Sequence, residues 1–446
     1  MNYPKNSLGL FDSTTIVAGS MIGSGIFLVS ADIARQIGSP GWLLFVWFLA
    51  GVLTVAAALS YGELAAMFPK AGGQYIYLRE AFGPGPAFLF GWTQFFVIQS
   101  GTIAAVAVAF ARFLAVFWPV APNKPIAIAL ILGLSWVNCR GLQAGKLVQN
   151  SFTVAKLFVL FGLVILGAVA LGAPVSPSVL PAISEHPFFG SLHFAALGPA
   201  MVGALFAADA WNNITFTAGE VRNPSRNLPG ALALGTGIVI ALYLAVNIAY
   251  LAVLPLDAIA HARADRVASA VVSAFLGNQA ATLVASCILI STFGCVNGLV
   301  LAGARVSYAM AQDGLFFRAA GNNNAQGVPA FALWAQAAWA SLLCLSGTYS
   351  ELLDYVIFAV LIFYILTITG LFVLRARKPD LARPYRAWGY PIVPGLYICA
   401  AAAISGSLLA APATRFQALA GLGCVLTGVP AYALFVRAMR MGALSS

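Results

Sequence analysis

Long apolar stretches that carry almost no charge constrain this chain more than any other feature. Of its 446 residues, 61% are hydrophobic and only 8% are charged. A water-soluble domain carries about a quarter of its residues as charges, so this chain has too little polar surface to face water. The apolar segments have the length of about 20 residues that a helix needs to cross a bilayer, and they lack the alternation of a membrane barrel. The sequence therefore predicts an all-α integral membrane protein and excludes a soluble enzyme, a disordered chain and a nucleic-acid-binding protein.

Breaks at proline, glycine and charge clusters divide the chain into twelve predicted transmembrane spans. With the N-terminus in the cytoplasm, most Lys and Arg residues fall in loops on the inner side, as the positive-inside rule expects. This topology explains the net charge of +10 without nucleic acid. It predicts a multi-pass protein of the cell (plasma or inner) membrane, in contact with membrane lipids and with both termini in the cytoplasm. The predicted spans cover residues 12–38, 42–67, 86–118, 125–140, 147–172, 192–219, 229–254, 268–310, 328–346, 351–374, 390–410 and 415–436.

Two of the predicted spans are interrupted by residues that disfavour a membrane helix. The first span contains three glycines in Gly19-Ser-Met-Ile-Gly-Ser-Gly25, and each Gly costs about 1 kcal/mol of helix propensity. The sixth span contains Asp209 and the polar run Trp211-Asn-Asn213. Discontinuous helices that meet near the membrane midplane form the substrate site of many secondary transporters. The two breaks therefore indicate a transporter.

The positions of the breaks along the chain also predict an internal repeat. Spans one and six are the leading helices of two halves of five spans each, and because five is odd, the second half starts from the opposite membrane face. We therefore expect twelve transmembrane helices, arranged as a five-plus-five inverted repeat with broken helices 1 and 6 plus two C-terminal helices. The first repeat covers residues 1–172, the second covers 192–374, and the two additional helices cover 390–436.

An unwound helix exposes amide N–H groups where its second half begins and carbonyl groups where its first half ends. A zwitterion fits such a site. We expect the N–H groups of Gly23, Ser24 and Gly25 to bind a substrate carboxylate, although close helix packing is the alternative explanation for the two glycines. The carbonyl groups expected to accept from an α-ammonium are those near Ile22, Phe206, Ala207 and Asp209.

Four ordered motifs carry a family resemblance. They are Gly19-Ser-Met-Ile-Gly-Ser-Gly-Ile-Phe27, Phe68-Pro-Lys-Ala-Gly-Gly-Gln-Tyr75, Phe206-Ala-Ala-Asp-Ala-Trp-Asn212 followed by Glu220-Val-Arg-Asn-Pro-Ser-Arg-Asn-Leu-Pro229, and Ser291-Thr-Phe-Gly-Cys-Val-Asn-Gly298. Together they resemble the amino acid-polyamine-organocation (APC) superfamily over nearly the whole chain. The motifs of the sixth and eighth spans are most similar to the L-amino-acid transporter (LAT) family, in its bacterial form. The resemblance implies the five-plus-five fold, alternating access and sodium-independent transport or exchange of amino acids.

Residue by residue, the resemblance makes Phe206 an aromatic gate over the substrate and Asn212 a neighbour of the side-chain pocket. Ala208 stands where the family often has a bulky aromatic residue, which affects the volume of the pocket that we expect near Ala208, Trp211 and Asn212. Animal members pair by a disulfide with a single-span glycoprotein, through a Cys in the outer loop between spans three and four. That loop has no Cys between Pro119 and Pro125, so we expect no disulfide-linked heavy-chain partner.

Lys156 is the only basic residue that the predicted topology leaves inside a span. A lysine at the centre of a span costs about 2.5–3.5 kcal/mol on insertion scales, so it must face the bundle interior. One interpretation is that it ties helices together by donating to carbonyl groups. The other, which the family resemblance favours, is that its ammonium takes the place of a sodium ion, bonding carbonyls near Gly23 and also Ser291 and Tyr243.

Together these observations predict an L-amino acid transporter that exchanges or passively carries small or medium neutral substrates. The alternative is a proton-coupled carrier, with cationic amino acids bound through Asp209 as one substrate class. As an intramembrane carboxylate, Asp209 must face water, substrate or backbone donors. An enzyme needs a cluster of catalytic side chains at one membrane face, and the sequence shows none. We expect no cofactor and no metal site.

Overall fold

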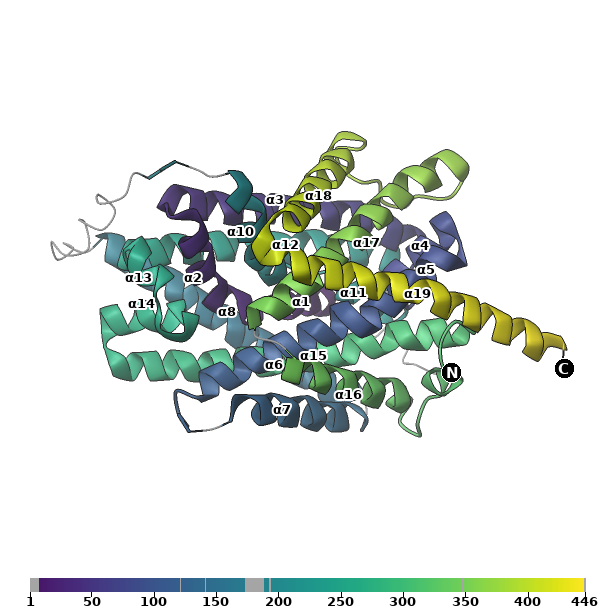
Figure 1. Cartoon of the computed structure of the whole chain (residues 1–446), viewed down its shortest axis with the longest axis horizontal. Helices are drawn as coiled ribbons and strands as arrows, with labels where there is room; N and C mark the ends of the chain where they lie inside the picture. The colour runs from purple at the N-terminus through teal and green to yellow at the C-terminus, as the bar shows by residue number, and fades with distance from the viewer. Residues whose placement is uncertain are drawn as a thin grey trace.

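The computed structural model describes residues 8–120, 122–140, 142–172, 188–191, 194–346 and 349–444 (Figure 1). Within these ranges nearly every element is a helix, and the β-type pairing is a single bridge between Leu8 and Val221. The helices are α1 Leu10–Met21, α2 Gly25–Ile37, α3 Pro40–Met67, α4 Gln74–Phe82, α5 Pro84–Thr93, the π-helical turn η1 Gln94–Gln99, α6 Ser100–Leu114, α7 Asn123–Asn138, α8 Leu142–Gly172, α10 Phe194–Ala207, α11 Asn213–Phe216, η2 Ala218–Glu220, α12 Pro224–Val253, α13 Leu256–Ala260, η3 Arg263–Asp265, α14 Val267–Leu276, α15 Asn278–Gln312, η4 Arg318–Gly321, α16 Ala330–Ser346, α17 Tyr349–Arg377, α18 Ile392–Ala410 and α19 Pro412–Leu444.

Many of these helices are long and apolar enough to cross a membrane. Among the described residues there are 8 such spans, or 9 if α1 and α2, which meet at an angle of 41°, are counted as one broken span. The bend confirms the break predicted in the first span. The predicted spans at 125–140, 192–219 and 328–346 correspond to the shorter helices α7, α10 with α11, and α16. The chain is therefore an all-helical, multi-pass membrane protein, as the sequence predicts.

The prediction of one continuous span over residues 268–310 was wrong. The structure places two helices there, α14 and α15, separated at Gly277. Gly277 has φ +83°, a conformation that residues with a side chain rarely adopt, and its N–H donates to Ser273 O across 3.0 Å to close α14. Both sides of the break are apolar, so hydropathy alone did not separate them.

The helices pack into one bundle (Figure 1), and among the candidate spans of the described residues the one formed by α5, η1 and α6 is the most buried. Helix α12 packs along α3 and α1, α10 lies against α2, and α15 contacts α6 and α8. Helices α18 and α19 lie on the outside, and side chains such as Phe416 and Leu434 point away from the bundle. Outward-facing apolar side chains are expected where a helix contacts lipid.

Ion pairs gather at the two ends of the bundle. At one end, Arg35 on α2 and Arg112 on α6 both pair with Asp265, at 2.8 and 3.6 Å. At the other end, Glu63 on α3 is fully buried. Its carboxylate accepts from Arg375 Nε and Nη2 at 2.9 and 2.5 Å and from the N–H of Ala387 at 2.6 Å.

Candidate functional site

The break between α1 and α2 is formed by residues 22–24. The N–H of Ile22 makes the last bond of α1, to Ala18 O at 2.9 Å, and the N–H of Gly23 then turns back to Met21 O at 2.8 Å. Of the three N–H groups predicted to bind a carboxylate, the group of Gly23 is thus engaged within the chain. Those of Ser24 and Gly25 stand at the start of α2, where N–H groups have no acceptor inside their helix and the helix dipole is positive.

The same turn leaves the last carbonyl groups of α1 without their usual helical donors. The carbonyl of Gly19 would normally accept from the N–H of Gly23, and it accepts instead from Lys156 Nζ at 2.8 Å. Ser20 O lies 3.5 Å from Cys295 Sγ, and Met21 O lies 3.0 Å from Tyr243 Oη. Side chains from α8, α15 and α12 therefore complete the hydrogen bonding of the open end of α1.

Lys156 is fully buried, and its ammonium donates to Gly19 O in the broken first span, whereas the sequence led us to expect carbonyls near Gly23. The two further bonds expected of its ammonium are not present among the described residues. Ser291 Oγ is buried without a hydrogen-bond partner there. The hydroxyl of Tyr243 binds backbone carbonyls, so it is directed at the helix break and not at the lysine.

The second break follows α10. The N–H of Ala208 completes that helix on Ala204 O at 3.0 Å, and the N–H of Asp209 turns to Phe206 O at 3.1 Å. Ala210 then adopts φ +65°, an uncommon conformation for a residue with a side chain. Non-glycine residues in this region are enriched at functional sites. The chain becomes helical again only at Asn213.

The two breaks touch each other. A Cβ atom added to Gly25 would lie 2.5 Å from the Cβ and 2.8 Å from the Cα of Ala207, closer than side chains can approach. The hydroxyl of Tyr243 is shared between Met21 O at 3.0 Å and Ala207 O at 3.2 Å, so it links the carbonyl ends of both helices. The N–H groups at the start of α2 and the carbonyls at the end of α10 are thereby brought together.

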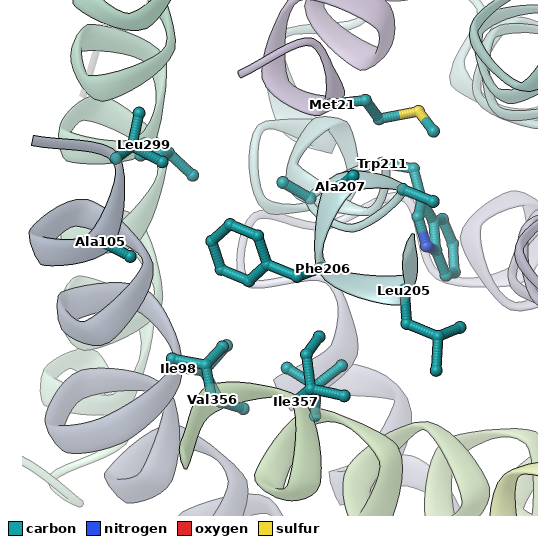
Figure 2. Packing of buried hydrophobic residues seen from close by; sticks show 14 of the residues in the cluster. Met21, Ile98, Ala105, Leu205, Phe206, Ala207, Trp211, Leu299, Val356 and Ile357 are labelled. Carbon is teal, nitrogen blue, oxygen red and sulfur yellow. The ribbon is translucent and has the colours of Figure 1, made fainter. Parts of the chain in front are cut away.

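Phe206 and Trp211 project to opposite sides of the second break (Figure 2). The ring of Phe206 points toward α6, which carries Ala105, on the side where Ile98 of η1 and Leu299 of α15 also lie. Its edge also meets Tyr349, with ring centroids 6.2 Å apart. Trp211 packs against Tyr61 and Tyr364, at 4.8 and 5.3 Å.

Tyr349, at the start of α17, was not identified from the sequence. Its hydroxyl lies 3.1 Å from Ser24 Oγ, and the guanidinium of Arg112 lies 5.6 Å from its ring centre. It lines a small cavity together with Leu28, Asp32 and Asp354. Tyr349 thus connects the first break to the end of the bundle that holds Asp265. Ser24 and Tyr349 are 325 residues apart, and no local signal joins them.

Asp209 and Tyr364 separate two cavities, and the Tyr364 hydroxyl donates to Asp209 Oδ1 at 2.6 Å. The polar cavity is small and has amide and carboxyl groups on its wall; these belong to Gln74, Gln94, Gln99, Asp209, Asn212 and Asn213. The apolar cavity is also small and is lined mainly by Leu205, Ala208, Trp211, Ile357 and Leu361. The structure therefore divides the predicted pocket, because Asn212 faces one cavity and Ala208 and Trp211 face the other.

Three glutamines that line the polar cavity were not predicted from the sequence as site residues. Gln74 accepts from Asn212 Nδ2 at 3.3 Å and donates to Phe363 O at 3.1 Å and Thr367 Oγ1 at 3.0 Å. Gln94 and Gln99 are amides inside an apolar span, and polar residues at such positions mark functional sites. That signal was available in the sequence.

Comparison of the sequence with known proteins finds similar amino acid transporters. Residues 8–426 match the sequence profile of the amino acid permease family. The b(0,+)-type amino acid transporter 1 of Homo sapiens is 31% identical over 447 residues, which cover 97% of this chain and 88% of that protein. The serine/threonine exchanger SteT of Bacillus subtilis is 32% identical, with 91% of each chain covered. The large neutral amino acids transporter small subunit 2 of Rattus norvegicus is 32% identical, over 97% of this chain and 81% of that protein.

Proposed function

The chain belongs to the amino acid permease family of the APC superfamily, and from this we propose that it is a sodium-independent transporter of small or medium neutral L-amino acids, working by alternating access. Its relatives with assigned functions carry amino acids, as their names state. The observation that carries the proposal is the contact of Gly25 with Ala207, which joins the N–H groups of one helix end to the carbonyls of another.

The proposed architecture has twelve spans in a five-plus-five inverted repeat. Residues 1–172 and 192–374 are the two repeats, and residues 390–436 supply the two additional helices. Two features support it: helix breaks occur in the leading span of each half, and α18 and α19 pack on the outside. We also propose a cell-membrane location with cytoplasmic termini, based on the distribution of basic residues.

At the proposed substrate site, the N–H groups of Ser24 and Gly25 bind the α-carboxylate. Carbonyl groups near Ile22, Phe206, Ala207 and Asp209 receive the α-ammonium. Gly23 takes part by turning the chain, since its own N–H is bonded to Met21. Phe206 closes the site from the side of α6 and α15, where its ring points.

Lys156 donates to the open end of α1, and Tyr243 links that end to α10. An ammonium group there can take the place of a transported sodium ion, because it binds a carbonyl that the helix break leaves without its backbone donor. The transporter is further proposed to work without a disulfide-linked partner, because the segment Pro119–Pro125 has no Cys.

A proton-coupled carrier, with cationic amino acids as one substrate class, is the second candidate, and the burial of Asp209 is the observation that favours it. This carboxylate is buried, lines both cavities and is bonded by the hydroxyl of Tyr364. Protonation of a buried carboxylate in a transport pathway can be linked to movement of substrate.

A counterflow assay in proteoliposomes distinguishes the sodium-independent transporter from the proton-coupled carrier. Purified protein is reconstituted into vesicles loaded with unlabelled L-alanine, and entry of a panel of labelled amino acids is measured with and without sodium. The proposal expects saturable entry of neutral L-amino acids that depends on internal substrate and is unchanged when potassium replaces sodium. Entry that disappears when a pH gradient is abolished favours the proton-coupled carrier. If no amino acid enters above protein-free vesicles, the proposed function is wrong.

A further inference from the structure

The segment that joins α17 to α18 has one side packed on the bundle and one side exposed. The two sides alternate along residues 385–388. The ring of Tyr385 packs against α3, and Ala387 is buried with its N–H donated into the bundle. Arg386 is exposed, and Trp388 is 72% exposed. The segment is therefore fixed from the inside while it presents a guanidinium and an indole ring on the outside.

Five basic residues lie in the stretch 375–386, and three of them are bound to carboxylates of the protein: Arg375, Lys378 and Arg383. Arg383 also donates to four backbone carbonyls of residues 374–381, so it organises the turn. The other two, Arg377 and Arg386, are exposed, and neither forms an ion pair with another described residue. Their charges can therefore pair with an anion from outside the chain.

An apolar strip, formed by Trp388, Ile392 and Leu396, continues from this segment along the outside of α18. Its members follow at intervals of four residues, which places Ile392 and Leu396 on one side of the helix, and these two are 69% and 64% exposed. Helix α18 is long and apolar enough to cross a membrane, and the strip reaches it at its first turn. Tryptophan is enriched where a membrane helix meets the lipid headgroups. We therefore expect Trp388 and Arg386 to lie at the membrane surface, with the rest of the apolar strip against lipid.

The chemistry of these groups fits the phosphate of an anionic phospholipid. A guanidinium group matches phosphate oxygens in a bidentate geometry, and basic residues beside a membrane span are attracted to anionic lipids. The positive end of the α18 dipole lies at the same place, because the helix begins at Ile392. A zwitterionic lipid also brings an ammonium group, which the two free arginines repel. Free phosphate has no hydrocarbon to cover the apolar strip.

We propose that the connection between α17 and α18 is a binding site for an anionic phospholipid. Arg386 holds its phosphate, Arg377 adds positive charge at the same end of the bundle, and an acyl chain runs along the apolar strip. With the proposed orientation of the chain, this lipid belongs to the inner leaflet. The same segment donates the N–H of Ala387 to the buried carboxylate of Glu63, so the bound lipid also stabilises that end of the bundle.

Fluorescence quenching tests the site directly. The protein is placed in phosphatidylcholine nanodiscs that contain increasing fractions of brominated phosphatidylglycerol or, in a parallel series, of brominated phosphatidylcholine. The chain has 9 tryptophans, so the signal of Trp388 is obtained as the difference between wild type and Trp388→Phe. We expect half-maximal quenching of that signal at a mole fraction about fivefold lower for brominated phosphatidylglycerol than for brominated phosphatidylcholine. Equal quenching by the two lipids overturns the proposal.

Substitution of the arginine shows whether the preference is local. Arg386→Gln, measured with and without Trp388→Phe, is expected to remove the preference for phosphatidylglycerol, and Arg386→Lys is expected to retain part of it. The matched control is Arg226→Gln, because Arg226 is also exposed and on the predicted inner side, while the nearby Leu228 is buried. It removes the same charge and should keep the wild-type preference. If Arg226→Gln lowers the preference as much as Arg386→Gln does, general attraction to the membrane surface explains the quenching and the proposed site is wrong.

Melting of the protein in detergent distinguishes a lipid from a soluble phosphate. Wild type is heated with short-chain phosphatidylglycerol, short-chain phosphatidylcholine or glycerol 1-phosphate. A higher melting temperature is expected with phosphatidylglycerol only, and the increase should be smaller in Arg386→Gln. Stabilisation by glycerol 1-phosphate would identify a site for soluble phosphate and overturn the lipid assignment. Neither measurement uses amino acid transport, so the lipid site and the proposed function are tested separately.

Discussion

Lys156 Nζ donates a hydrogen bond to the carbonyl oxygen of Gly19 at 2.8 Å. It replaces the N–H group of Gly23, which would bind this carbonyl in a continuous helix but donates to Met21 O instead. The bond couples α8 to the open end of α1. We therefore propose that Lys156 acts at the helix break, where its ammonium group interacts favourably with the negative end of the α1 dipole.

Replacing Lys156 by methionine, which has a similar length and no charge, should reduce the initial rate of counterflow by about tenfold or more. The Gly19 carbonyl would be buried without a donor, at a cost of about 1–3 kcal/mol to the conformation that binds substrate. The rate is measured at equal amounts of reconstituted protein. Lys124→Met is the control, since Lys124 also donates to a carbonyl, Leu345 O at 2.9 Å, but at an exposed position. Wild-type rates in the Lys156 variant would exclude a role in transport.

Gly25→Ala should abolish transport, because the added methyl group would occupy the space of Ala207 and separate the two breaks. Gly237→Ala on α12 is the matched control, since no atom lies within 4 Å of the added Cβ. Removing the opposing methyl group in the double variant Gly25→Ala/Ala207→Gly should restore part of the activity. Independent, additive losses in the double variant would show that the contact does not matter.

Tyr349→Phe should favour opening of the bundle at the end that holds Arg112 and Asp265. The variant loses the bond between Tyr349 Oη and Ser24 Oγ, worth about 1 kcal/mol, which changes a two-state population about fivefold. Opening is measured as the rate at which a membrane-impermeant maleimide labels Leu353→Cys, which lines the adjoining cavity. Tyr432→Phe on α19 serves as control. An unchanged labelling rate would contradict the prediction.

Glu63→Gln should lower the stability of the folded protein strongly. Glu63 is fully buried between Arg375 and Arg383, and removing one partner of a buried ion pair costs about 3–5 kcal/mol. Melting in detergent, followed by size-exclusion chromatography, gives the readout. Glu80→Gln is the comparison, because Glu80 pairs with Lys378 at 2.9 Å in a more exposed position and should change stability by less than about 1 kcal/mol. Equal melting temperatures for the two variants would contradict the predicted difference in their stability.

The features that the sequence predicted correctly are those encoded locally. Hydropathy over about 20 residues identifies membrane helices, and three closely spaced glycines mark the bend between α1 and α2. Gly277 escaped detection because one glycine in an apolar run does not reveal its φ angle. The π-helical turn at Gln94–Gln99 has no compositional signature, and so it could not be predicted.

Side-chain partners across the bundle were the hardest to predict. Lys156 was expected to bind carbonyls near Gly23 and Ser291, but it donates to Gly19 O, and no bond to Ser291 is present among the described residues. Likewise, Ala208 and Asn212 are four residues apart, yet they face different cavities. Such details depend on where the chain bends at Asp209 and Ala210, which only the packed structure fixes.

The buried carboxylate of Glu63 restricts how this bundle can move. It binds α17 through Arg375 and the segment leading to α18 through Arg383 and Ala387. We therefore expect these parts and α3 to move together when one part of the bundle rotates against another. We expect the chain to bend at the two unwound segments, residues 22–24 and 208–212, where regular helical bonding is interrupted.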